Sequence, residues 1–356
     1  MNVKNRLLGF LVMLLPVMVN AQEPLSIIQL FDSLKVNPNT VSSQITAEKA
    51  LQYKRIATGT LYPEIYAFGK YDYSSDPMGM LPVSPNDLIQ MVQNSDVAQP
   101  FSQDIWRGGV NVSMPIFVKS IYTMAAKAQK MYEAAQIGAA IELQKNESVL
   151  VGANSNLLYM ENLEKALKSK RASVEKTKEL IELKVKNGRA PESALLILTT
   201  NLNDLDLNIA QLQLNKEKAL AAIYSLTNVK LDSAVGLNQT GDFQRGEFKV
   251  LEPLQKKMDA SRLGARAEQE KLYPALVANA NYVYNQGKSY NNNQTINNDF
   301  TAAAVTLRIP LFEKSQYSKI KLGKLEVREQ ENELEKMRLQ ITAEASQYES
   351  SMEILS

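Results

Sequence analysis

This chain lacks two of the residue types that most often carry out covalent or acid–base chemistry. Its 356 residues include no cysteine and no histidine. A disulfide framework, a thiolate metal site and a cysteine nucleophile are therefore excluded, and the commonest general base and metal ligand are missing. The remaining carboxylates are scattered along helical stretches, a pattern more typical of solvated helix faces than of paired catalytic acids. We expect no catalytic residue, no cofactor, no metal site and no enzymatic activity.

The N-terminus has the three parts of a secretory signal peptide. Lys4 and Arg6 precede an apolar run from Leu7 to Val19, and Val19-Asn20-Ala21 is a small-residue cleavage site. A signal peptide over residues 1–21 is favoured over a buried N-terminal helix because all three parts occur in order. Its removal takes two of the 40 basic residues and none of the 38 acidic ones. The resulting balance of charge predicts no nucleic acid partner.

Four stretches alternate between apolar and polar residues with a period of two, which is typical of strands. They cover residues 61–73, 104–117, 274–285 and 299–311, and each could cross a bilayer, which takes about 9–11 tilted residues. We expect one face to contact lipid and the other to line a lumen. The expected lipid-facing residues are Ile65, Tyr71, Tyr73, Trp106, Val110, Val112, Met114, Leu276, Tyr282, Tyr284, Val305, Leu307 and Ile309. The expected lumen-facing residues are Asn111, Ser113, Thr306 and Arg308.

A long helical hairpin follows the second strand. The run 118–187 contains no proline and would measure roughly 105 Å as one helix. Gly188 is suited to the helix C-terminus, and Pro191 and Glu192 suit the start of a returning helix. That helix carries apolar residues at alternating steps of three and four from Leu195 to Leu226. Such a 3.5-residue period favours a left-handed coiled coil over an ordinary amphipathic helix.

The same plan then repeats with an offset near 200 residues. Leu61-Tyr62-Pro63 recurs as Leu272-Tyr273-Pro274, and Pro115-Ile116-Phe117 recurs as Pro310-Leu311-Phe312, which indicates an internal duplication. The predicted organisation is a first repeat 22–228 with its hairpin 118–227, a linker 229–250, and an incomplete second repeat 251–356 that ends in a helix 315–356.

Four strands are too few to close a membrane barrel, since the smallest have about eight. Open sheet edges are not tolerated in lipid, so the barrel must be shared between chains. Two protomers would give a barrel too narrow for an open channel, whereas three would give 12 strands. The predicted fold class is thus an α+β membrane protein, with long coiled-coil helical hairpins and four strands contributed to a shared transmembrane β-barrel.

These residues resemble the TolC family of outer membrane efflux proteins. The resemblance covers the chain from Leu25 to its end and is carried by the repeated tripeptides, the Gly188 turn and the leucine heptads that follow it. It implies a homotrimer in the outer membrane with helices in the periplasm. It also implies passive export in a tripartite efflux or type I secretion system, through a periplasmic adaptor (membrane fusion) protein and an inner-membrane pump. The implied adaptor-docking tip is Asn187, Gly188, Arg189, Ala190, Pro191 and Glu192.

The sequence departs from the family pattern in two places. Arg189 stands where the family tip has an apolar residue. By the repeat offset, a second turn and its returning helix would lie beyond Ser356, so the chain is expected to be C-terminally truncated relative to the family. Two other readings stay open: a periplasmic adaptor, which also has a long helical hairpin, and an exported coiled-coil scaffold.

Overall fold

The computed structural model describes residues 26–237 and 249–355 of the chain. The predicted signal peptide lies outside these residues, as does part of the predicted linker. The helices are α1 Ile27–Lys35, α2 Pro38–Gly59, α3 Pro85–Gln93, α4 Lys119–Lys186, α5 Glu192–Thr227, α6 Glu252–Glu270 and α7 Lys314–Leu355, with a 3-10 turn η1 Lys249–Leu251 before α6. The strands are β1 Glu64–Gly79, β2 Phe101–Phe117, β3 Ala275–Lys288 and β4 Thr295–Arg308.

Contacts divide the described chain into two compact units. Residues 26–38 and 143–237 form the first unit, and residues 39–142 and 249–355 form the second. This grouping interleaves the two sequence repeats, because helices and strands from both repeats pack together in the second unit. The division of the chain into an earlier and a later repeat remains a prediction from the sequence.

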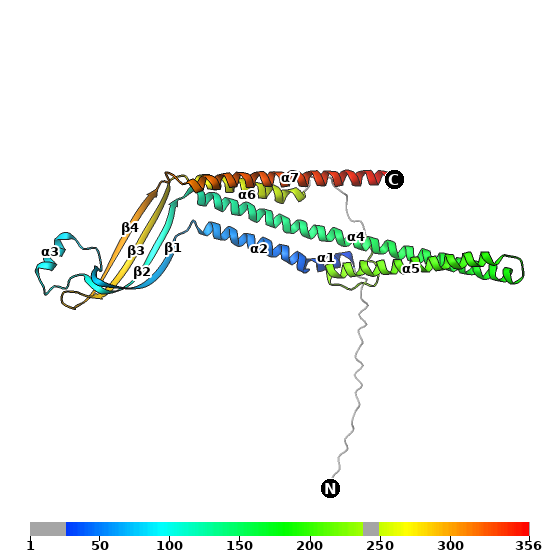
Figure 1. Ribbon diagram of the computed structural model, residues 1–356, viewed down its shortest axis with the longest axis horizontal. Coiled ribbons are helices and arrows are strands. Elements are labelled where there is room, and N and C mark those ends of the chain that lie inside the picture. Colours follow the sequence, from blue (N-terminus) through cyan, green and yellow to red (C-terminus); the bar gives the residue numbers. More distant parts are fainter. Residues whose placement is uncertain (1–25, 238–248, 356) are drawn as a thin grey trace, which may run out of the picture. The chain divides into compact units, whose positions relative to one another are not determined.

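The second unit contains one four-stranded antiparallel sheet with the strand order β1-β2-β3-β4 (Figure 1). Strand order therefore follows chain order, although α4, α5 and α6 lie between β2 and β3 in the sequence. The β2–β3 register shifts between Pro115 and Phe117, where proline cannot donate to the ladder and the strand bulges. Within the described residues, β1 and β4 pair on one side only and form the two edges of the sheet.

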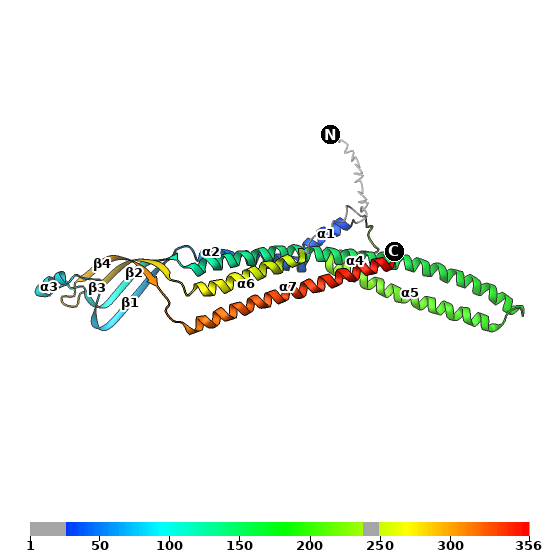
Figure 2. The same cartoon turned by 90° about the horizontal axis from the view of Figure 1, so that it is seen from above.

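Helices α6 and α7 pack side by side in the same unit (Figure 2). Their backbones approach closely at Gly323 on α7, where an added Cβ atom would lie 3.0 Å from the Cα atom of Ala265 on α6. At the end of α6, the carboxylate of Glu270 is buried and accepts hydrogen bonds from the Thr123 hydroxyl on α4 and from Arg266. Small residues and a satisfied buried acid thus fix the helices next to the sheet.

The first unit is built on the second half of α4 and on α5. Its core is apolar and consists of Leu30, Leu34, Leu150, Leu157, Ile223 and Val235. Asn154 on α4 is buried and pairs twice with the backbone of Val235, donating at 2.7 Å and accepting at 2.9 Å. Asn37 donates to the carbonyls of Ser225 and Leu226 at the end of α5. These amides hold non-helical segments against the hairpin.

The predicted heptad face of α5 is the face that packs. Its residues are all buried or half-buried: Leu195, Leu198, Leu202, Leu205, Ile209, Leu212, Lys216, Ala219, Ile223 and Leu226. A lysine is accommodated in this series because its ammonium lies 3.7 Å from Glu161 and 3.8 Å from Glu164 on α4. The long helices are consistent with the predicted coiled coil.

The predicted element ranges differ from the observed ones in the sheet. The strands run further toward the β1–β2 and β3–β4 loops than predicted, and much of the asparagine-rich stretch 285–298 between the predicted third and fourth strands belongs to β3 and β4. The extension occurs because backbone pairing continues from Asn285↔Asn298 to Lys288↔Thr295. The long β1–β2 loop also contains the helix α3, which begins with a side-chain cap from Ser84 to the Asp87 amide and with Pro85 in its first turn.

Candidate functional site

One face of the sheet carries apolar and aromatic residues from all four strands, with Asp104 and Asp299 on the same face toward the β1–β2 and β3–β4 loops, and we call it the apolar face. Register puts Ile65 opposite Val112, Tyr71 opposite Trp106 and Leu276 opposite Leu307, and directly opposed residues share a face. Every predicted lipid-facing residue within a strand lies on this face: Ile65, Tyr71, Tyr73, Trp106, Val110, Val112, Met114, Leu276, Tyr282, Tyr284, Val305 and Leu307. Ile309 does not, because β4 ends at Arg308 and Ile309 lies just beyond it.

The side chains of the apolar face are exposed in the single chain. Ile65 is 65% exposed, Trp106 is 62% exposed and Val305 is 64% exposed. The rings of Tyr71 and Trp106 pack on each other with centroids 4.8 Å apart. Exposed apolar patches on proteins mark surfaces that contact a membrane or a partner. We therefore expect lipid or another molecule to cover the apolar face.

The opposite face, which we call the polar face, holds the predicted lumen-facing residues. Asn111 pairs with Tyr66 and Ser113 pairs with Glu64, while Thr306 and Arg308 pair with residues of β3. Apolar residues are mixed among them, and Ile105 and Val283 are buried on this face. The register therefore brings the predicted lumen-facing residues onto one face.

The turn between α4 and α5 forms the tip of the hairpin. Gly188 has φ +68°, the left-handed conformation that glycine adopts without strain. The Arg189 amide donates to the Lys184 carbonyl at 2.8 Å, and the Gly188 amide donates to the Val185 carbonyl at 2.9 Å. These two bonds make a Schellman motif, as the predicted glycine stop requires. Pro191 is the N-cap of α5, and the first helical residue is Glu192. Pro191 makes no side-chain capping bond.

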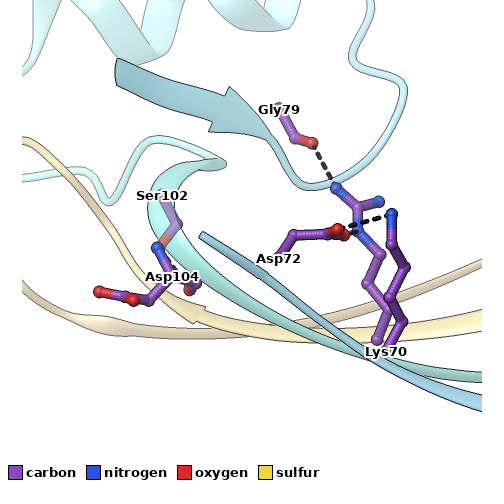
Figure 3. A network of polar contacts seen from close by, with 6 residues as sticks. Lys70, Asp72, Gly79, Ser102 and Asp104 are labelled. Carbon is purple, nitrogen blue, oxygen red and sulfur yellow. Dashed lines mark hydrogen bonds and ion pairs between the residues drawn. The ribbon is translucent and has the colours of Figure 1, made fainter. Parts of the chain in front are cut away.

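The polar face also carries an ion-pair cluster whose residues were not among the predicted site residues. Asp72 on β1 lies 2.5 Å from Lys70 and 2.9 Å from Arg107 on β2. Figure 3 shows the Lys70 and Asp72 side chains of this polar network close to Gly79. The alternation of residues places Lys70, Asp72 and Arg107 on one face in the sequence. Their contacts depend on the cross-strand register, which the sequence does not state.

Neither a metal-binding cluster nor a membrane-spanning helix occurs in the described ranges. Residues 26–237 and 249–355 contain no group of three or more potential metal ligands. In the same ranges, no helix combines the length and the apolar character needed to cross a membrane.

Comparison with known proteins places the fold. No family model and no curated relative matches the sequence. The Campylobacter jejuni CmeC outer membrane channel matches with a TM-score of 0.68 and 18% identity, over 89% of this chain and 68% of that one. The Vibrio cholerae outer membrane protein VceC matches with a TM-score of 0.72 and 13% identity, over 90% of this chain and 77% of that one. The chain has the fold of these outer membrane channels.

A third solved structure agrees with this assignment. The Neisseria gonorrhoeae MtrE outer membrane channel, in its open state, matches with a TM-score of 0.65 and 14% identity, over 87% of this chain and 69% of that one. At these identities the likeness is one of fold. It confirms the fold that the resemblance to the TolC family predicted, with long helices and a four-stranded sheet in one chain.

Proposed function

We propose that this protein is an outer membrane channel that acts as a passive export conduit. The observation that carries the proposal is the exposed apolar face on a sheet with two unpaired edges. Each strand has 14–17 residues, more than the roughly 9–11 that a tilted strand needs to cross a bilayer. Lipid would cover the apolar face, including the tyrosines and the tryptophan that it carries within β1, β2 and β3.

The two open edges require a closed assembly of several copies. Unpaired backbone groups in lipid cost several kcal/mol each, and four strands cannot close a barrel alone. A homotrimer would pair β4 of one copy with β1 of the next and give 12 strands with the polar face inside. The helices would continue from this barrel into the periplasm.

Reconstitution tests the channel directly. The full chain, expressed with its own N-terminus, should fractionate with the outer membrane, migrate as a trimer on a native gel and give stepwise conductance in a planar lipid bilayer. Because α5 packs its heptad face within the hairpin, we do not expect α5 by itself to bind the membrane. Recovery of a monomer in the soluble periplasmic fraction would refute the proposal.

We further propose that the tip of the hairpin contacts a periplasmic adaptor and, through it, an inner-membrane pump. The support is the rigid geometry of the tip: the Schellman motif at Gly188 presents Arg189 and Ala190 on a fixed turn. A photo-crosslinking residue at Ala190 should give an adduct that mass spectrometry identifies as a periplasmic adaptor. The same residue at Thr200, an exposed position on α5, should give none. Equal adducts at both positions would contradict tip docking.

A further inference from the structure

A row of polar residues crosses the whole sheet on the polar face. Lys70 on β1 is directly opposite Arg107 on β2, Arg107 is opposite Asn285 on β3, and Asn285 is opposite Asn298 on β4. Each strand thus contributes one polar side chain at the same level, two of them basic, and we call the four residues the basic row. Two like charges directly opposite one another destabilise a sheet, so the Lys70–Arg107 pair needs a nearby acid.

A single carboxylate compensates the two cations. Asp72 bonds both Lys70, at 2.5 Å, and Arg107, at 2.9 Å (Figure 3). One acid against two bases leaves one net positive charge per chain at this level. The Lys70 side chain is 62% exposed, whereas the Asp72 side chain is mostly covered. The excess charge is therefore on the most exposed side chain of the three.

The far end of the β1–β2 hairpin, where Gly79 pairs with Phe101, folds back over the polar face next to the basic row. Arg107 donates from Nη2 to the Gly79 carbonyl at 3.1 Å, and Met80 is fully buried. An added Cβ atom at Gly287, which pairs with Ile105 on the polar face, would lie 3.1 Å from the Met80 Cε atom. The backbone at residues 79–80 thus covers part of the polar face instead of continuing straight beyond it.

Asn285 adds unsatisfied hydrogen-bonding groups to the row. Its side chain is fully buried, and neither its amide nitrogen nor its amide oxygen has a hydrogen-bond partner among the described residues. Leaving a buried polar side chain without partners costs about 1–3 kcal/mol by general experience. Asn285 is therefore shielded from solutes, and the accessible charge of the row is on Lys70.

We propose that the basic row forms a constriction that favours small anionic solutes at the end of the conduit near α3. This inference rests on the proposed channel and on a lumen lined by the polar face. Rings of Lys and Arg side chains select anions in pores, and the three chains together would supply three net positive charges at one level. The solute class that the row fits is a small anion such as chloride or a carboxylate.

The size of the effect follows from simple electrostatics. Three net charges at a distance on the order of 10 Å in water, screened over a Debye length of about 10 Å at 0.1 M salt, raise the local chloride concentration about twofold. The measurement is the reversal potential of the reconstituted full-length channel in a KCl gradient. Chloride permeability should exceed potassium permeability by about twofold or more.

Two substitutions at Lys70 test the inference without breaking the Arg107 contacts. Lys70→Gln leaves no net charge in the row and should abolish the preference for chloride. Lys70→Glu gives one net negative charge per chain and should reverse the preference toward potassium. Lys288→Gln is the matched control, because this substitution also removes one positive charge, but at an exposed position on the opposite face of the sheet.

The outcomes separate the two proposals. Conductance steps with a chloride preference that Lys70→Gln removes and Lys288→Gln retains support the basic row. Conductance steps without a chloride preference, or with one that the Lys70 variants do not change, overturn the inference and leave the channel intact. An absence of conductance from the wild-type trimer overturns the proposed channel, and the inference with it.

Discussion

The Lys256 ammonium on α6 lies 3.0 Å from a carboxylate oxygen of Glu133 on α4. Gln129 and Lys130, one turn away on α4, also donate to this carboxylate at 2.9 Å and 3.0 Å. The hydrogen bond from Gln129, followed by those from Lys130 and Lys256, lowers the pKa of Glu133 to about 2. A helix junction in the second unit therefore depends on an ionised carboxylate.

Glu133→Gln should make the protein less sensitive to acid. A carboxyl group whose folded pKa is depressed stabilises the fold above its unfolded pKa, about 4.3, and loses this contribution as the pH falls toward its folded pKa of about 2. Because the group is partly exposed, we expect a contribution of about 1 kcal/mol. Thermal unfolding followed by circular dichroism at pH 6, 4 and 2.5 should show a smaller fall for Glu133→Gln than for the wild type.

Glu344→Gln is the control for this measurement, since Glu344 is an exposed glutamate on α7. It should follow the wild-type pH profile. An equal acid dependence in Glu133→Gln and in the wild type would show that the Glu133 cluster does not contribute to stability in this window.

Thr123→Val should destabilise the junction of α4 and α6. The Thr123 hydroxyl is a donor to the buried Glu270 carboxylate, and the isosteric valine would leave that carboxylate with fewer partners at a cost of about 1–3 kcal/mol. Chemical denaturation in detergent measures the change. Thr342→Val is the matched control, because the Thr342 hydroxyl is exposed and bonds only to a carbonyl of its own helix. Equal effects of the two substitutions would argue against a special role for the buried pair.

Ala303→Arg and Ala302→Arg provide a matched test of which face meets lipid. The two alanines are neighbours near the middle of β4 and are both exposed, but Ala303 pairs with Ala280 on the apolar face and Ala302 pairs with Asn281 on the polar face. Arginine on a lipid-facing position near the bilayer midplane costs about 2–4 kcal/mol. We expect Ala303→Arg to reduce the yield of membrane-inserted trimer and Ala302→Arg to be tolerated. If Ala302→Arg lowered the yield and Ala303→Arg were tolerated, the polar face would be the face that meets lipid.

Two glycine substitutions in the hairpin should have opposite effects on stability. Gly188→Ala places a Cβ atom on a residue with φ +68° and should destabilise the tip by about 1 kcal/mol. Gly152→Ala lies in the interior of α4 with no atom within 4 Å of the added Cβ, so it should stabilise the helix by about 0.5–1 kcal/mol. Hydrogen exchange of the flanking amides measures both. Faster exchange around residue 188 only in Gly188→Ala is the expected result, and unchanged exchange there would count against the strained turn.

The helical hairpin and the faces of the strands could be predicted because their signals are periodic. Leu202, Leu205, Ile209 and Ile223 are buried at positions of the predicted heptad series, since a 3.5-residue period leaves one stripe for the partner helix. Strand alternation likewise placed Tyr71, Tyr73, Trp106, Tyr282 and Tyr284 on one face. Gly188 signalled the turn because few other residues adopt a positive φ without strain.

The parts that the sequence did not predict depend on pairing and on short local signals. The charged cluster around Asp72 requires the register Lys70↔Arg107, and the strands around Asn285 are held by backbone bonds that do not depend on side-chain polarity. The helix α3 has nine residues, too few for a periodic pattern, in a stretch with the composition of a loop. The Ser84-Pro85 cap followed by Asp87 was the signal that could have found it.

The ladder between β2 and β3 has a consequence for how the protein is made. During synthesis the β1–β2 hairpin emerges first, and the partner strand for β2 appears only after α4, α5 and α6 have followed. Until then one long strand edge and an apolar surface are unprotected, which favours aggregation. Pairing across such a large sequence separation is intrinsically slow. For the proposed outer membrane channel, factors that hold the chain before β3 appears would therefore raise the yield of folded protein.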